Sequence, residues 1–190
     1  MLFRKELDIP EDVTVELEEG PNITVEGPNG GPITKDFSHI KGIDIKKKGK
    51  QMVFEAHFPR NSIVSLANTI INIIDNLIKG VQTNYKYVSK VCYSHFPCSV
   101  EAKPNKNEIH VVNFLGERAP RVINYDPDRV SVEVEGDDVY LIGSDKEVLG
   151  QTAAKLKQIC HIRKKDPRIY QDGVYLYKIL HGDEILWQIK

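Results

Sequence analysis

The 190-residue sequence is poor in cysteine and tryptophan and has no long hydrophobic run. Its three cysteines are an odd and small number, which excludes a disulfide scaffold and favours a reducing compartment. No apolar run approaches the roughly 18 residues of a membrane span, and the N-terminus lacks an apolar signal-peptide core. We therefore expect a cytoplasmic protein with no membrane partner.

Recognisable catalytic motifs are also absent, because neither a Gly-x-Ser-x-Gly elbow nor a GxxxxGK[ST] phosphate-binding loop occurs. The acidic residues cluster in polar runs, whereas raised carboxyl pKa values arise at isolated positions within apolar stretches. Cys92, His95 and Cys98 have the chemistry of zinc ligands. On a strand, however, alternation would send His95 to the face opposite the two thiols, and no further ligand pair follows at finger spacing. We predict neither an enzyme nor a metal or cofactor site.

The net charge of −1 is close to zero, but the charges are segregated along the chain. Residues 6–19 contain seven acids and no base, and residues 126–147 contain eight acids against two bases. Residues 46–50 contribute four lysines, and residues 155–178 hold seven Lys or Arg against two acids. Salt screens charges over about 10 Å, so local fields of this kind matter more to a polyanion than the net charge does.

Alternating runs and one long apolar-periodic segment organise the first half of the chain. Short strands are predicted at residues 13–17, 23–26, 33–37, 43–46 and 51–58, with a turn at residues 18–22. A helix is predicted after them, with Asn61 or Ser62 as its N-cap and Gly80 as its stop. Its predicted apolar face consists of Ile63, Leu66, Ala67, Ile70, Ile73, Ile74, Leu77 and Ile78.

The second half repeats this plan. Residues 130–143 match residues 13–27 as a hairpin with one residue's difference in length. In the helices, Leu66, Thr69 and Ile73 match Leu149, Thr152 and Leu156. A repeat this long favours two copies of one domain. We predict an α+β fold of two tandem, internally duplicated domains, each a mainly antiparallel sheet packed against one helix. The predicted domains are residues 1–81 and residues 82–190. The tail from Ile179 is expected to fold back as a strand or to dock on a neighbouring molecule.

Cations and aromatic side chains are interleaved in residues 155–178. Helical spacing ends at Asp166-Pro167, and a β-type run follows the turn at Asp172-Gly173. A cationic helix end with a glycine turn and stacking aromatics favours contact with a nucleic-acid backbone. A solvated helix end would have the same composition, so both interpretations stay open on these residues alone.

A longer signature spans this segment, formed by Gln158, Ile162, Lys165, Arg168, Tyr170, Asp172, Gly173, Val174, Tyr175 and Leu176. It resembles the C-terminal signature of a universal large-subunit ribosomal protein family, number six in bacteria and nine in eukaryotes. Residues 79–81, 93–97 and 113–117 resemble the eukaryotic branch. The resemblance implies a structural constituent of the large ribosomal subunit, built from two α+β domains. It also implies binding to large-subunit rRNA near the factor-binding, sarcin–ricin region, with neighbouring ribosomal proteins as partners. The location would be the cytoplasmic ribosome, with nuclear or nucleolar assembly if the source is eukaryotic.

We predict that the second domain makes the RNA contacts. Phosphate contacts are predicted for Arg163, Lys164, Lys165 and Arg168, supported by Lys86, Lys90, Arg118 and Arg121. Tyr170 is the best stacking candidate, and Gly116 and Gly173 would let the backbone approach RNA closely. The lysines of residues 46–50 are interpreted as a hairpin tip, and Asn29 stands where the family carries Lys or Arg. The alternative function is a protein-interaction module whose acidic runs bind a basic partner.

Overall fold

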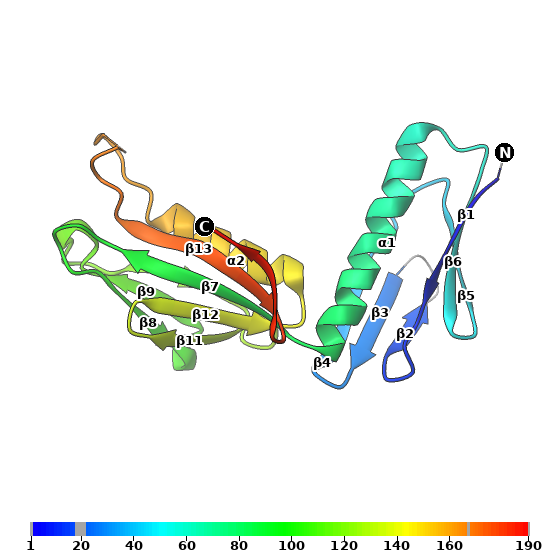
Figure 1. Cartoon of the computed structure of the whole chain (residues 1–190), viewed down its shortest axis with the longest axis horizontal. Helices are drawn as coiled ribbons and strands as arrows, with labels where there is room; N and C mark the ends of the chain where they lie inside the picture. The colour runs from blue at the N-terminus through cyan, green and yellow to red at the C-terminus, as the bar shows by residue number, and fades with distance from the viewer. Residues whose placement is uncertain (1, 18–21, 167, 190) are drawn as a thin grey trace. The chain divides into compact units, whose positions relative to one another are not determined.

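The computed structural model describes residues 2–17, 22–166 and 168–189 (Figure 1). The chain divides into two compact units, residues 1–84 and residues 85–190. Each unit combines antiparallel sheets with one long helix, which confirms the predicted α+β class. Most of the turn predicted at residues 18–22 lies outside the described residues. The predicted boundary after residue 81 falls inside a helix that ends at Gln82. That each unit folds autonomously stays a prediction.

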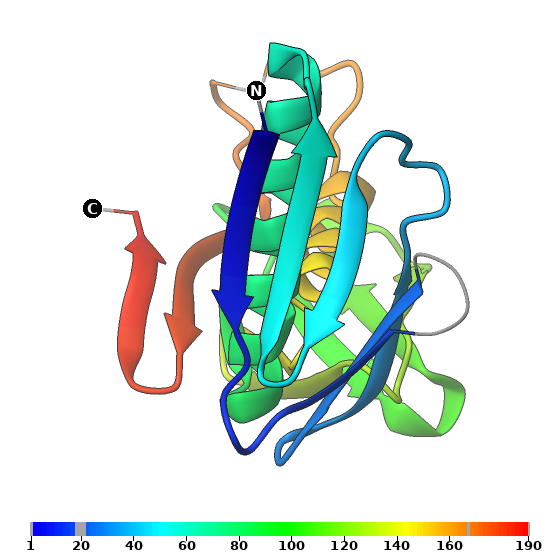
Figure 2. The ribbon, with the colours of Figure 1, turned by 90° about the vertical axis from the view of Figure 1, so that its right-hand side faces the viewer.

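The first unit has two three-stranded antiparallel sheets. One contains, in spatial order, β1 (Leu2–Asp8), β6 (Gln51–His57) and β5 (Asp44–Lys48). The other contains β2 (Thr14–Leu17), β3 (Asn22–Gly27) and β4 (Gly30–Asp36). Helix α1 (Asn61–Gln82) packs against both sheets, and Figure 2 shows β1, β6 and β5 side by side in front of it. Their shared core includes Ile23, Phe54 and Ile74, each fully buried.

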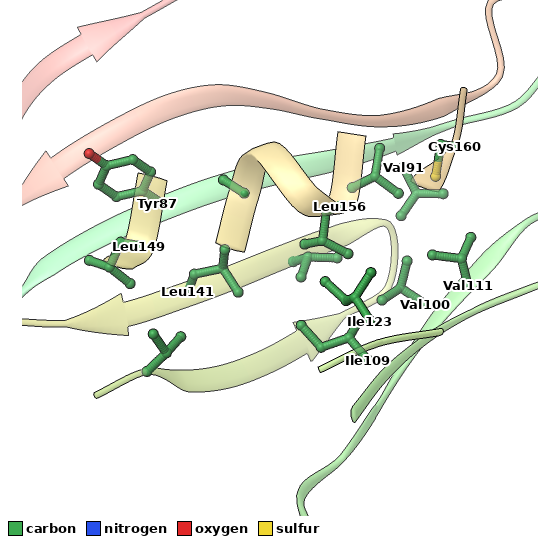
Figure 3. Packing of buried hydrophobic residues seen from close by; sticks show 14 of the residues in the cluster. Tyr87, Val91, Val100, Ile109, Val111, Ile123, Leu141, Leu149, Leu156 and Cys160 are labelled. Carbon is green, nitrogen blue, oxygen red and sulfur yellow. The ribbon is translucent and has the colours of Figure 1, made fainter. Parts of the chain in front are cut away.

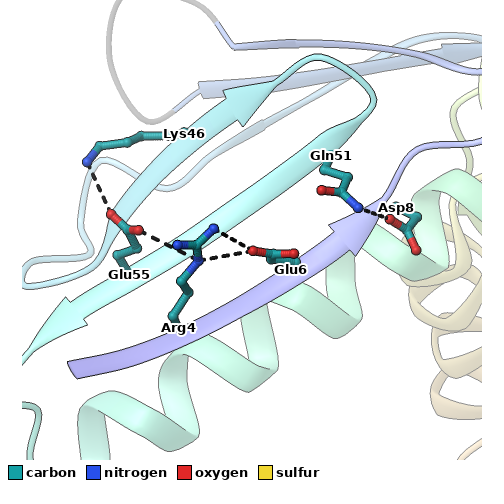
Figure 4. Close-up of polar contacts among 6 residues, drawn as sticks. All are labelled: Arg4, Glu6, Asp8, Lys46, Gln51 and Glu55. Atoms are coloured by element: carbon teal, nitrogen blue, oxygen red, sulfur yellow. Dashed lines mark hydrogen bonds and ion pairs between the residues drawn. The ribbon is translucent and has the colours of Figure 1, made fainter. Parts of the chain in front are cut away.

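Strand β1 was not predicted from the sequence, because part of it belongs to the acidic run of residues 6–19. Its open face carries charged side chains that pair across the sheet (Figure 4). Arg4 forms an ion pair with Glu6 at 2.6 Å and approaches Glu55 at 3.9 Å, while Lys46 reaches Glu55 at 3.2 Å. Cross-strand charge pairs of this kind favour the sheet, so a polar sequence can still form a paired strand.

Helix α1 differs at both ends from the prediction. Its N-cap is Arg60, without a side-chain cap, and neither Asn61 nor Ser62 has that role. At the other end the helix continues past Gly80, because Val81 is fully buried against Gly27 of β3. A Cβ atom on Gly27 would lie 2.6 Å from the Val81 side chain. The loop after β3 then caps the helix, since Asn29 donates from its backbone to the Val81 carbonyl (2.9 Å) and from its side chain to that of Gln82.

The second unit is built on a five-stranded antiparallel sheet. Its spatial order is β11 (Ser131–Glu135), β12 (Asp138–Gly143), β7 (Tyr85–Cys92), β13 (Gly173–His181) and β14 (Glu184–Gln188). A second sheet has the order β10 (Arg121–Asn124), β9 (Glu108–Val112) and β8 (Ser99–Lys103). Helix α2 (Lys146–Ile159) packs between them, and Figure 3 shows Leu149 and Leu156 of α2 directed at Leu141, Ile123 and Val100.

The internal repeat exists, but its alignment differs from the predicted one. The order β1 to β6 followed by α1 recurs as β7 to β12 followed by α2, with the same strand pairings. The hairpin at residues 130–143 is therefore the copy of β5–β6, and the match to residues 13–27 was wrong. Both hairpins turn at a glycine with positive φ, Gly49 at 60° and Gly136 at 59°, which L-residues with a side chain rarely adopt.

The helices also align one residue away from the predicted match. The buried residues Ala67, Ile70, Ile71 and Ile74 correspond to Leu149, Thr152, Ala153 and Leu156. Leu66 of the predicted face is exposed.

The tail folds back, as predicted, with β14 paired to β13. No helix among the residues that the structure describes is long and apolar enough to cross a bilayer.

Candidate nucleic-acid interface

Arg163, Lys164, Lys165 and Arg168 lie in the loop between α2 and β13. The N-cap of α2 is Asp145, whose carboxylate accepts a hydrogen bond from the backbone N–H of Glu147 (2.9 Å), and the helix ends at Ile159. Beyond it, the Asp166 carboxylate accepts from the Arg168 backbone N–H and Nε at 2.9 and 3.1 Å. These bonds hold the pKa of Asp166 below its ordinary value. The loop is thus folded by its own side chains, while Pro167 lies outside the described residues.

Asp172 anchors the end of this loop. It is buried, and its carboxylate accepts from the backbone N–H of Ser94 (2.8 Å) and lies 3.4 Å from the Ser94 hydroxyl. The next residue, Gly173, pairs with Cys92 in the β7–β13 ladder, lies against the Tyr175 ring and is buried. The Asp-Gly turn therefore has a structural task, which is to tie the start of β13 to the loop after β7.

The Cys-x-x-His-x-x-Cys segment is a loop, and the expected strand alternation was wrong. Strand β7 ends at Cys92 and β8 begins at Ser99. Cys92 is exposed and Cys98 is buried, while exposed His95 packs edge-on against Phe96 with ring centroids 4.7 Å apart. No group of three potential metal ligands occurs in the described part of the chain.

Arg121 of β10 connects three segments of the second unit. Its Nε and Nη2 donate to the two Glu117 carboxylate oxygens at 2.8 and 2.6 Å. Its Nη1 donates to the carbonyls of Ile159 (2.5 Å) and His161 (3.3 Å), at the C-terminal end of α2. The hydrogen bond from Arg121 lowers the pKa of Glu117, and the guanidinium lies 4.3 Å from the Phe114 ring. Arg121 is therefore largely occupied by its own protein.

A cleft of about 620 Å³, which we call the α2-end cleft, brings several predicted residues together. Arg121, Arg163 and Lys165 line it. Tyr170 and Gly173 line an adjoining pocket of about 180 Å³. Both hollows share His161 and Ile162, so Arg163, Lys165, Tyr170 and Gly173 border one continuous surface, whereas Lys164 and Arg168 line neither hollow.

The remaining predicted residues are placed differently. Gly116 has a φ of 78° and lies against Phe96, at the turn that precedes β10. Lys90 is exposed near the end of β7 that pairs with Gly173. Lys86 lies six residues before Cys92 on β7, about 20 Å away at 3.3 Å per residue, and it lines neither hollow. Its ammonium group lies 4.1 Å from the centre of the Tyr140 ring.

The cations differ in whether they have partners. Arg168 pairs with Asp166 at 2.9 Å, and Lys165 stands 4.4 Å from the centre of the Tyr170 ring. Exposed Arg118, Arg163 and Lys164 have no polar partner among the described residues. Unpaired cations of this kind can bind a polyanion without first breaking a contact within the protein.

No role was predicted from the sequence for Leu115, Ile159 or His161, which all line the α2-end cleft. Leu115 could not be found from periodicity, because its φ of 51° places it outside any helix or strand pattern.

Comparison with known proteins identifies the family. The family model for Ribosomal protein L6 matches residues 96–173, which run from the loop before β8 to the start of β13. The chain is 39% identical over 173 residues to the large ribosomal subunit protein uL6 of Staphylothermus marinus, covering 91% of this chain and 92% of that protein. It is 42% identical over 175 residues to uL6 of Ignicoccus hospitalis, covering 90% and 91%. The uL6 protein of Methanocella arvoryzae is 37% identical over 172 residues, with 90% and 94% covered. The chain belongs to the ribosomal protein L6 family.

Membership in the L6 family makes the chain a structural component of the large ribosomal subunit rather than an enzyme. The family predicted from the signature is thereby confirmed, while its eukaryotic branch stays a prediction. The segment matched by the L6 model includes the Arg121–Glu117 pair, the α2-end cleft and Asp172. The loop scaffold described above therefore lies within the region that the L6 model matches.

Proposed function

We propose that the second unit binds large-subunit rRNA through the α2-end cleft and the basic loop beside it, at the sarcin–ricin region. The observation that carries this proposal is the presence of exposed, unpaired Arg163 and Lys164 on a loop where Arg168 is paired with Asp166 and Lys165 lies over the Tyr170 ring. Each cation that meets a phosphate releases condensed counterions, and this release drives binding to RNA. Family membership supports the large subunit as the source of that RNA, and the resemblance of the loop signature supports the region.

Within this proposal the predicted residues have different tasks. Arg163 and Lys164 contact phosphates directly, with Arg118 and Lys90 as further exposed cations at the same end of the unit. Lys165 and Tyr170 act as a stacked pair, and Arg168 and Arg121 hold the loop. Gly116 and Gly173 serve the packing of their own turns.

The alternative, a module whose acidic runs bind a basic partner, has less support from the first unit. Several acids of residues 6–19 already have partners in their own unit. Lys50 reaches Glu11 at 2.6 Å, Gln51 donates to Asp8 at 2.7 Å, and Gln82 donates to Asp12 at 2.9 Å. A basic partner would have to displace these contacts.

Reconstitution of large subunits that lack this protein tests the proposal. We expect the wild-type chain to sediment with the subunits through a high-salt wash, and an Arg163→Gln, Lys164→Gln double variant to be released at lower salt. A Lys41→Gln, Lys48→Gln variant is the matched control, because it removes the same charge from two exposed lysines of the first unit. Equal release of both variants would support the alternative.

Directed cleavage of the rRNA locates the contact. Cys92 is exposed and pairs with Gly173, whereas Cys98 and Cys160 are buried, so a hydroxyl-radical source can be attached at Cys92 alone. The proposal predicts strand cuts in the sarcin–ricin region, absent from a Cys92→Ser variant. Cuts confined to another region would contradict the location while leaving RNA binding intact.

A further inference from the structure

The α2-end cleft has two kinds of lining. The side chains of Leu115, Ile159 and Ile162 are half-buried and apolar, whereas Arg163 and Lys165 are exposed cations. Its volume of about 620 Å³ falls within the range of roughly 300–1,000 Å³ found for small-molecule sites. The cleft therefore offers an apolar wall with positive charge at its edge.

The one carboxylate that lines the cleft, that of Glu117, does not repel an anionic ligand. Glu117 accepts two hydrogen bonds from Arg121, which offsets its charge within the cleft. The charges of Arg163 and Lys165 then remain without an acidic partner in the lining, which favours an anionic ligand.

A nucleotide matches this combination better than an inorganic anion or a duplex does. A free phosphate would make no use of the apolar wall. Base pairs inside a duplex are stacked and present no face to a side chain, whereas an unpaired base can leave the stack and lie against one. The exposed side chains of Gln158 and His161 lack polar partners within the described residues, and each can both donate and accept. Both side chains therefore suit hydrogen bonding to the edge of such a base.

The cleft is also held in shape before any ligand arrives. Arg121 joins Glu117 to the carbonyls of Ile159 and His161, so opposite walls share one guanidinium. Leu115 keeps a left-handed backbone with φ of 51°, a strained conformation that clusters at binding sites in other proteins. A preformed site avoids part of the ordering cost of binding.

We propose that the α2-end cleft takes one unpaired nucleotide of the bound RNA, with its base against Leu115, Ile159 and Ile162 and its phosphate beside Arg163 and Lys165. This inference rests on the proposed function, because it specifies what part of the RNA the same surface receives.

The test uses the full chain and three RNA hairpins of equal stem sequence. One is fully paired, one carries a single bulged 2-aminopurine nucleotide, and one carries an abasic bulge at that position. We expect the 2-aminopurine hairpin to bind roughly 5- to 150-fold more tightly than the other two, the range of one base stacking on protein. Its fluorescence should change on binding, because the base leaves its neighbours in the stem.

A cleft-filling variant provides the matched comparison. Gln158→Trp places a large side chain in the cleft without changing charge, and Gln151→Trp makes the same change on an exposed position of α2 outside the lining. Gln158→Trp should abolish the preference for the bulged base, and Gln151→Trp should retain it. Leu115→Ala, which removes part of the apolar wall, should reduce the preference.

The outcomes separate this inference from the function on which it rests. No binding to any hairpin would contradict the proposed function itself. Equal binding to the paired and bulged hairpins would overturn the nucleotide site and leave RNA binding in place. The site would be overturned as well by an abasic bulge that binds as tightly as the base, or by a Gln158→Trp variant that keeps the preference.

Discussion

Arg121 joins three segments of the second unit through a single guanidinium group. It forms a forked pair with Glu117, reaches the last carbonyls of α2 and lies over the Phe114 ring. Cations at a helix C-terminus also interact favourably with the helix dipole. The residue thus sets where the basic loop leaves the helix.

We predict that Arg121→Met lowers the free energy of unfolding of the second unit by about 1.5–3 kcal/mol, the usual contribution of hydrogen bonds to charged groups. Arg121→Lys should recover only part of this, because an ammonium group cannot form the forked pair. Urea unfolding of the full chain measures the effect. Arg118→Met is the control, since exposed Arg118 has no polar partner among the described residues, and an equal loss in that variant would contradict the role given to Arg121.

The buried thiols predict a pH dependence of stability. Burial, with smaller contributions from Cys160 and Asp172, raises the pKa of Cys98 from 9.0 to about 11, and burial also raises that of Cys160. Because the pKa of a buried thiol is higher in the folded state than in the unfolded state, its contribution to stability is complete at pH values below the unfolded-state pKa. This contribution is lost as the pH rises through the folded-state pKa. Wild-type stability should therefore fall between pH 9 and about 11, and it should fall less steeply in Cys98→Ala. Parallel slopes for the two proteins over this range would contradict the prediction.

Strand β14 is an unusual element, because apolar side chains are exposed along its length. Ile185, Leu186 and Trp187 are about half exposed, and the strand lies at the edge of its sheet. An apolar edge strand leaves backbone groups free to pair with another chain.

We predict that the isolated chain self-associates through this edge, and that an Ile185→Lys, Trp187→Lys variant stays monomeric at higher concentration. The thermal midpoint should change little, because these side chains bury little surface. Sedimentation velocity over a concentration series checks this. A variant that associates as strongly as the wild type would place the contact elsewhere.

Some elements could be predicted from local pattern and others could not. Helix α1 and the hairpin β5–β6 follow from periodicity and a glycine turn, which are local signals. Strand β1 is specified by its pairing with β6, a contact about 50 residues away in the sequence, and its charged face concealed it. The repeat was misaligned because the hairpins β2–β3 and β11–β12 share an alternating pattern that carries no information on sheet order.

The candidate site shows the same division between local and distant signals. The loop cations and Tyr170 could be identified from composition. Composition could not show which cations have a partner within the protein, because the partners of Arg121 include Ile159 and His161, about 40 residues later in the chain. The cleft wall at Leu115 depends on a backbone conformation that no alternation or helical spacing describes.

At the scale of the whole molecule, each unit has its own buried core. One cluster of buried residues runs from Ile9 to Val81 and the other from Tyr85 to Val174, and the two share no residue. We predict that a fragment of residues 85–190 folds alone with a cooperative thermal transition. Near-ultraviolet circular dichroism and calorimetry would show it. A fragment that stays unfolded would mean that the second core depends on the first unit.

The salt dependence of RNA affinity distinguishes specific contacts of the basic loop from diffuse electrostatic attraction. Binding of the full chain to an rRNA fragment that contains the sarcin–ricin region is measured over a salt series. Arg163→Gln, Lys164→Gln should flatten the slope of log K against log salt by roughly 1.4 to 1.8 units, at about 0.7 to 0.9 per phosphate contact. Tyr170→Ala should cost about 1–3 kcal/mol with little change in slope, as expected for a stacking contact.

The control, Lys41→Gln, Lys48→Gln, removes the same charge from the first unit. Its slope should equal that of the wild type. If both double variants flatten the slope equally, binding is diffuse electrostatic attraction and the loop beside the α2-end cleft has no special part in it.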